Sequence, residues 1–222
     1  MNLKVLLNNK WVALLLLMLT FSLIYNPFTK FPFTFCIIIL AVLLLSYLQD
    51  GNFKNLNFKK IKSSEIKIIL ICYLILELSM DFIFQPLTSK VFNEPADYSS
   101  FKIIENNPHQ YFKWLVNMWI SAAIGEELLF RGFAFSQFRK LFGEKKILLV
   151  FLSAIMFSLP HLYQGISGLV MTFLFGLAFG FIYLKFNNIW INIIVHGLID
   201  TVFLTLSYYG LTDFYSGFNI IL

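Results

Sequence analysis

The amino-acid sequence predicts an all-α membrane protein, a polytopic transmembrane helical bundle of about seven spans. Of its 222 residues, 59% are hydrophobic and only 13% are charged, whereas a soluble domain carries roughly 45–50% apolar and about 25% charged residues. The mean hydropathy is +0.76. Several apolar runs approach the roughly 20 residues that a helix needs to cross a bilayer. These observations exclude a water-soluble enzyme, a disordered chain and a disulfide-stabilised secreted domain.

The apolar runs predict a single membrane domain over residues 1–222. Pro27 follows the first span and Pro86 follows the third, as expected for a residue that ends helices. The polar segment 85–110 is predicted to be a long loop. The first span lacks a small-residue cleavage site, so we interpret it as a retained helix rather than a signal peptide. The predicted spans are residues 11–25, 31–48, 66–84, 114–138, 147–161, 166–184 and 189–209.

The distribution of basic residues predicts the orientation. With seven spans, most of the 17 Lys and Arg residues fall in loops on the same side as the N-terminus. Cytoplasmic loops carry the excess of Lys and Arg, so the N-terminus is placed inside and the C-terminus outside. A formal charge of +5, spread between apolar runs, does not indicate nucleic-acid binding. The expected surroundings are therefore a lipid bilayer.

Three charged residues interrupt the predicted fourth span: Glu126, Glu127 and Arg131. An ionisable group near the bilayer centre costs from about 2.5 to more than 10 kcal/mol unless it is paired or hydrated. Glu127 and Arg131 are four residues apart, which favours a charge-assisted pair on one helix face. Glu126 is rotated by about 100° from that face, so it remains available as a general base. The structural alternative is a network that ties helices together.

Two histidines complete the candidate site. His161 follows Pro160 at the end of the fifth span, and His196 lies four residues before Asp200 in the seventh. An aspartate on the same face can hold an imidazole and fix its tautomer. A lone histidine in a membrane is more often an interhelical hydrogen-bonding residue than a catalyst. Two histidines together with several intramembrane carboxylates indicate catalysis.

Weaker signals lie in two other spans. Glu77 and Asp81 are four residues apart in the third span, where they either line the same cavity or hydrogen-bond between helices. Gly176 and Gly180 in the sixth span have the spacing of close helix packing.

Three motifs on separate predicted helices resemble those of a known family. They are Glu126-Glu127-x-x-x-Arg131, Phe157-x-x-x-His161 and His196-x-x-x-Asp200, in this order. Each motif alone is weak. The ordered set, over about residues 114–207, resembles the CAAX prenyl protease 2 and bacteriocin-processing family of intramembrane peptidases, also called the abortive-infection family. The first three spans carry no motif of this family.

The resemblance implies a membrane-embedded endopeptidase with six catalytic-site residues: Glu126, Glu127, Arg131, His161, His196 and Asp200. Glu126 would activate water for attack on a peptide carbonyl, with His161 helping to hold that water. His196 and Asp200 would stabilise the oxyanion, and the remaining pair would orient the site. A base, a polarised water and an oxyanion donor are what amide hydrolysis needs.

Members of this family are often named metalloproteases, because carboxylates and imidazoles can hold zinc. This sequence has no His-Glu-x-x-His helix, and its candidate ligands are scattered over three helices. We therefore expect a glutamate-dependent site without a cofactor. A zinc ion held by Glu126, His161 and His196 remains the alternative.

The resemblance leaves the substrate class open. Asp200 stands where eukaryotic CAAX proteases carry Asn, and bacterial members share this variant. A composition rich in Phe, Ile and Lys also points to a bacterial cytoplasmic membrane. The expected substrate is a membrane-associated peptide or protein, either of the CAAX type or a peptide precursor.

Two other functions stay open from the sequence. One is a non-catalytic bacteriocin-immunity or scaffold membrane protein, although a scaffold need not retain the complete motif set. The other is a proton-coupled transporter that uses the intramembrane acids. Transporters commonly show two related halves, whereas here all motifs lie in the last four spans.

Overall fold

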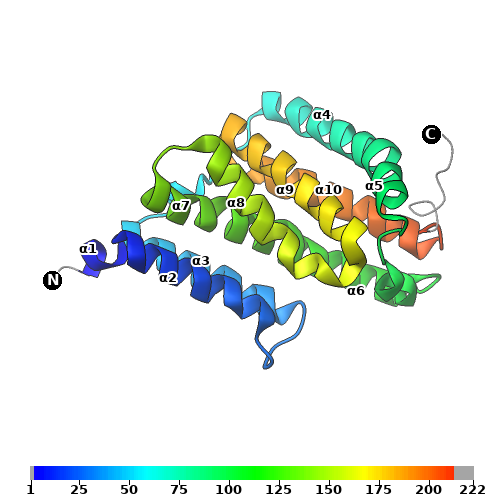
Figure 1. Ribbon diagram of the computed structural model, residues 1–222, viewed down its shortest axis with the longest axis horizontal. Coiled ribbons are helices and arrows are strands. Elements are labelled where there is room, and N and C mark those ends of the chain that lie inside the picture. Colours follow the sequence, from blue (N-terminus) through cyan, green and yellow to red (C-terminus); the bar gives the residue numbers. More distant parts are fainter. Residues whose placement is uncertain (1–2, 213–222) are drawn as a thin grey trace.

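The computed structural model describes residues 3–212. Within this range the chain forms helices and connecting loops without a β-strand, which confirms the all-α class. Figure 1 shows the long helices running roughly side by side. The hairpin of α2 (Lys10–Ser22) and α3 (Phe33–Asp50) lies at one edge, and α4 (Ser63–Ser79) lies at the other.

The N-terminal hairpin packs on the helix that carries Glu126. A short α1 (Leu3–Leu7) precedes α2, and a 3₁₀ turn over Leu23–Tyr25 follows it. α2 contacts α7 (Ala134–Phe142), and α3 contacts the segment Trp119–Phe133. The inward side chains of the hairpin are fully buried, whereas its outward Leu and Phe side chains are exposed. Exposed apolar faces of this kind suit a lipid environment.

The third long helix continues past the predicted break. α4 leads into a π-helical turn over Met80–Phe84 and then into α5 (Gln85–Phe92). The prediction that Pro86 ends this helix is wrong, because Pro86 occupies the first turn of α5, where its missing N–H is tolerated. The predicted loop 85–110 therefore shrinks to 93–107, which includes a 3₁₀ helix over Ser99–Ile104.

The fourth long helix is also longer than predicted and is not α-helical throughout. α6 (Pro108–Met118) continues as a π-helix over Trp119–Phe133 and then as α7. π-helical turns bond each N–H to the carbonyl five residues back and occur frequently at functional sites. The α-helical geometry assumed from the sequence thus does not hold at Glu126 and Glu127.

The last three long helices form the other half of the bundle. α8 (Lys146–Ser158) ends in a 3₁₀ turn over Leu159–Gln164, and α9 (Gly165–Phe186) and α10 (Ile189–Tyr208) follow. α8 and α9 pack closely on each other. A Cβ on Gly176 would lie 2.8 Å from Cα of Ala154, and one on Gly180 would lie 2.9 Å from a Val150 methyl. The two glycines are therefore packing residues, as their spacing predicts.

Several helices are long and apolar enough to cross a membrane. By length and composition these are Phe33–Asp50, Lys146–Phe186 and Ile189–Tyr208, and Lys10–Tyr25 is a shorter apolar helix. The second of these ranges contains α8 and α9, which fold back on each other at the 3₁₀ turn. Each of the seven predicted spans is largely helical, whereas the number of crossings and the orientation stay predictions.

The close approach of α8 and α9 predicts a specific instability. Gly176→Val should lower the free energy of unfolding by about 1–3 kcal/mol, because the added methyls meet the backbone of α8. Phe181→Val on the exposed face of the same helix is the control. Thermal unfolding of both variants in detergent measures the difference, and equal melting temperatures would contradict the packing.

Candidate active site

A fully buried carboxylate stands at the centre of the motif-bearing helices. Glu127 Oε1 accepts hydrogen bonds from Arg131 Nη1 and from His196 Nδ1, each with a donor–acceptor distance of 3.0 Å. Its Oε2 accepts from Asn192 Nδ2 over 3.1 Å. The side chains of Glu127 and Arg131 are 0% exposed. One carboxylate thus ties the π-helix of the fourth long helix to α10.

The guanidinium of Arg131 extends this network to α9. Its Nη2 donates to the carbonyl of Gly176 over 3.2 Å. Its carbon Cζ lies 4.3 Å from the ring centre of Phe157 and 5.2 Å from that of Phe179. Asn192 donates in addition to the carbonyl of Phe179 over 2.8 Å. Arg131 therefore combines a buried ion pair with cation–π contacts.

The neighbouring Glu126 has a different environment. Its side chain is partly buried and lines a cavity of about 490 Å³. Among residues 3–212, no hydrogen-bond or ion-pair partner is present for its carboxylate. The sequence-based expectation that Glu127 pairs with Arg131 and Glu126 stays unpaired is therefore met.

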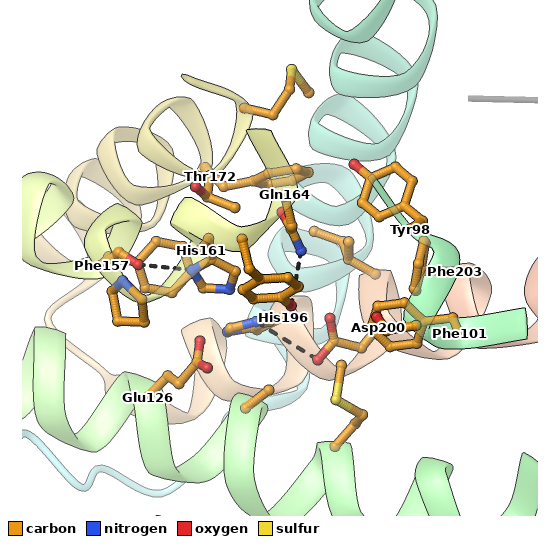
Figure 2. A pocket seen from close by; sticks show the side chains of 18 of the residues that line it. Tyr98, Phe101, Glu126, Phe157, His161, Gln164, Thr172, His196, Asp200 and Phe203 are labelled. Carbon is orange, nitrogen blue, oxygen red and sulfur yellow. Dashed lines mark hydrogen bonds and ion pairs between the residues drawn. The ribbon is translucent and has the colours of Figure 1, made fainter. Parts of the chain in front are cut away.

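Both motif histidines line the same cavity (Figure 2). His161 Nδ1 lies 3.0 Å from the carbonyl oxygen of Phe157. Because a carbonyl only accepts, this nitrogen carries the proton and Nε2 holds a lone pair. His196 Nε2 lies 3.7 Å from Asp200 Oδ2, an ion-pair distance but too long for a good hydrogen bond. In Figure 2, Glu126, His161 and His196 surround one part of the cavity.

The partner that orients His196 differs from the predicted one. The sequence spacing assigns this role to Asp200, whereas the shorter contact comes from Glu127. Glu127 pairs with Arg131, so its carboxylate accepts and His196 Nδ1 donates. The i, i+4 rule finds partners within a helix but cannot reveal one on another helix. This is the reason that the contact of His196 with Glu127 was not predicted.

The sequence analysis also missed Asn192, which lies four residues before His196 on α10. A buried polar residue on the same helix face as a motif histidine was the signal available. The two acids of the third helix, Glu77 and Asp81, do line the cavity, which selects the first of their two proposed roles.

The zinc alternative at Glu126, His161 and His196 stays a prediction. No group of three His, Cys, Asp or Glu side chains in residues 3–212 comes together to hold a metal ion. Nδ1 of His161 and Nδ1 of His196 are both engaged in hydrogen bonds, which leaves Nε2 of each ring as the nitrogen that could bind a ligand.

A family comparison covers the same helices. The model described as "Type II CAAX prenyl endopeptidase Rce1-like" matches residues 108–202, which include all three motifs. Over this segment the chain is similar to the Rce1-like family. No curated protein and no solved structure was found to match the chain. This match, together with the long apolar helices, indicates an integral membrane protein and a protease.

The buried ion pair predicts a large effect of removing its cation. Arg131→Ala should lower the free energy of unfolding by about 3–5 kcal/mol, because Glu127 would remain buried without its guanidinium partner. Arg139→Ala is the matched control, since Arg139 pairs with the exposed Glu144, and exposed pairs contribute about 0–1 kcal/mol. Thermal unfolding in detergent compares them. An Arg131→Ala protein as stable as the control would contradict the pairing.

Proposed function

We propose that this protein is a membrane-embedded endopeptidase that hydrolyses a peptide bond of a membrane-associated peptide or protein by water activated at Glu126. The observation that carries the proposal is the different environment of two adjacent carboxylates. Glu127 is buried and fully hydrogen-bonded, whereas Glu126 faces the cavity without a partner. The family match supports the CAAX-type endopeptidase class.

The first chemical step needs a base and a held water. The Glu126 carboxylate accepts a proton from water, while the lone pair on His161 Nε2 accepts a hydrogen bond from the same water and holds it in place. The water oxygen attacks the peptide carbonyl carbon, and the carbonyl π bond opens to an oxyanion. Proton transfer of this kind contributes about 10²–10⁴-fold to a rate.

The oxyanion then needs a hydrogen-bond donor, and His196 would provide it. With Nδ1–H bound to Glu127, the imidazole presents Nε2 toward the cavity. A proton on Nε2 donates to the oxyanion, and Asp200 compensates the charge of the imidazolium. Glu126 then gives its proton to the leaving nitrogen as the C–N bond breaks. Glu127, Arg131 and Asn192 act as positioning residues because they hold His196 without reaching the substrate.

The role of Glu126 is tested by its isostere. Glu126→Gln should reduce peptide cleavage by at least about 10²-fold, because the amide keeps the volume but cannot accept the proton. Glu105→Gln, an exposed acid outside the cavity, is the control. Both proteins are purified in detergent and incubated with hydrophobic and isoprenylated peptides, with and without chelator, and products are read by mass spectrometry.

Each outcome of this experiment distinguishes the proposed function from one alternative. Full activity of the Glu126→Gln protein would remove this residue from the catalytic role. Loss of the parent protein's activity in the presence of chelator would favour the zinc alternative. Absence of cleavage by the parent across the peptide set would favour the bacteriocin-immunity or scaffold function.

His196 contacts Glu127 and Asp200 at different distances, so we expect substitutions of these two residues to lower kcat/KM unequally. Asp200→Asn should lower kcat/KM less than about tenfold, or 1.4 kcal/mol, because its 3.7 Å contact is not what orients the ring. Glu127→Gln should cost far more, since it removes the acceptor shared by Arg131 and His196. Steady-state kinetics on one peptide compares them, and a larger loss at Asp200 would reverse the assignment.

A further inference from the structure

The third long helix brings two more carboxylates into the cavity. Glu77 lies in the last turn of α4 and Asp81 in the π-helical turn that follows, and both side chains line the cavity. α4 packs on α10, so this pair faces the motif helices. Asp200 of α10 lines the same cavity as Glu77 and Asp81. The pair lies outside the segment that matches the family model.

The cavity has no fixed cation to balance these acids. Its lining contains four carboxylates and two imidazoles but, among the described residues, no Lys or Arg. Arg131 is buried outside the lining and is engaged by Glu127. Neither Glu77 nor Asp81 has a hydrogen-bond or ion-pair partner within residues 3–212. Unpaired acids at membrane depth are costly, and they mark functional sites.

A separate feature beside the acids also indicates a ligand. Gln85 is only 2% exposed, lines the same cavity, and has no hydrogen-bond partner for Nε2 in the described part of the chain. Its Oε1 accepts from the Tyr98 hydroxyl over 3.5 Å, which leaves the amide N–H groups available. A buried donor without a partner is unfavourable. A peptide carbonyl entering the cavity would satisfy it.

Aromatic rings complete this end of the cavity. Figure 2 shows Tyr98, Phe101 and Phe203 on the Asp200 side, away from Glu126 and His161. The Phe101 ring centre lies 4.7 Å from that of Phe203 and 5.4 Å from that of Trp114. Carboxylates beside aromatic faces favour an organic cation with an apolar stem. A lysine or arginine side chain has this character.

We propose that Glu77 and Asp81 form a subsite that recognises a Lys or Arg side chain of the peptide substrate. The basic side chain would lie between these carboxylates and the aromatic rings, while the scissile carbonyl lies near Glu126 and His196. Gln85 would donate to a backbone carbonyl of the same peptide. The proposal rests on the proposed peptidase function and specifies that the substrate carries a basic side chain.

The test measures binding separately from cleavage. Fluorescently labelled hydrophobic peptides are made in matched sets that carry Lys, Gln or Glu at one position, and this position is moved along the peptide. Binding is measured by fluorescence anisotropy with the Glu126→Gln protein in nanodiscs, so that hydrolysis does not interfere. We expect the best Lys peptide to bind at least about tenfold more tightly than its Gln partner, because hydrogen bonds between charged groups are stronger than those between neutral groups.

The same measurement is repeated after removing the two charges. In the Glu126→Gln background, Glu77→Gln with Asp81→Asn should bring the Kd of the Lys peptide to that of the Gln peptide. Glu105→Gln in that background is the control and should leave the preference unchanged. Each single variant is tested as well, and unchanged melting temperatures verify that the proteins are folded.

Two results would overturn the subsite. One is equal binding of Lys, Gln and Glu peptides at every position, and the other is a Lys preference that survives in the double variant. Cleavage of the same peptides by the parent protein is assayed in parallel. A charge preference in binding without cleavage would support the proposed subsite and contradict the peptidase function. Cleavage without a charge preference would contradict only the proposed subsite.

Discussion

The buried carboxylate of Glu127 is the interaction on which the arrangement of the motif helices depends. It receives donors from Arg131, His196 and Asn192, and Arg131 carries the connection on to the carbonyl of Gly176. Three helices are thereby fixed around one ionised group away from water. A carboxylate in a low-dielectric interior is tolerated only when its lone pairs are satisfied in this way. The network therefore sets both the helix packing and the orientation of His196.

The fourth long helix is π-helical where it carries the two adjacent glutamates. Glu126 and Glu127 both lie in the π-helical segment Trp119–Phe133, yet one side chain is buried in the network and the other faces the cavity. Adjacent residues point in different directions in any helix, and the partners available in each direction decide their roles. A π-helical turn also carries Asp81, which lines the same cavity. Both acid-bearing helices thus depart from α geometry beside the cavity.

The helices outside the family-matched segment also contribute to the cavity. The N-terminal hairpin supplies Phe31 and Phe35 to the lining, and the third long helix supplies Glu77 and Asp81. The side chain of Phe35 packs where a Cβ on Gly125 would stand, next to Glu126. In the proposed mechanism the matched helices hold the reacting groups, and the preceding helices form a wall that a substrate would contact. Differences in specificity within such a family can then arise without changes to the motifs.

Composition alone determined the all-α membrane class, because too few polar residues are present to cover a soluble particle. Helical spacing determined the pairing of Glu127 with Arg131, since residues four apart meet on one helix whatever surrounds it. No comparable spacing rule predicts which residues on different helices are in contact. Only the tertiary structure decided that Glu127 orients His196, that Asn192 joins them, and that the third helix continues beyond Pro86. Those outcomes depend on which side chains meet across the bundle, and that is fixed by packing rather than by sequence separation.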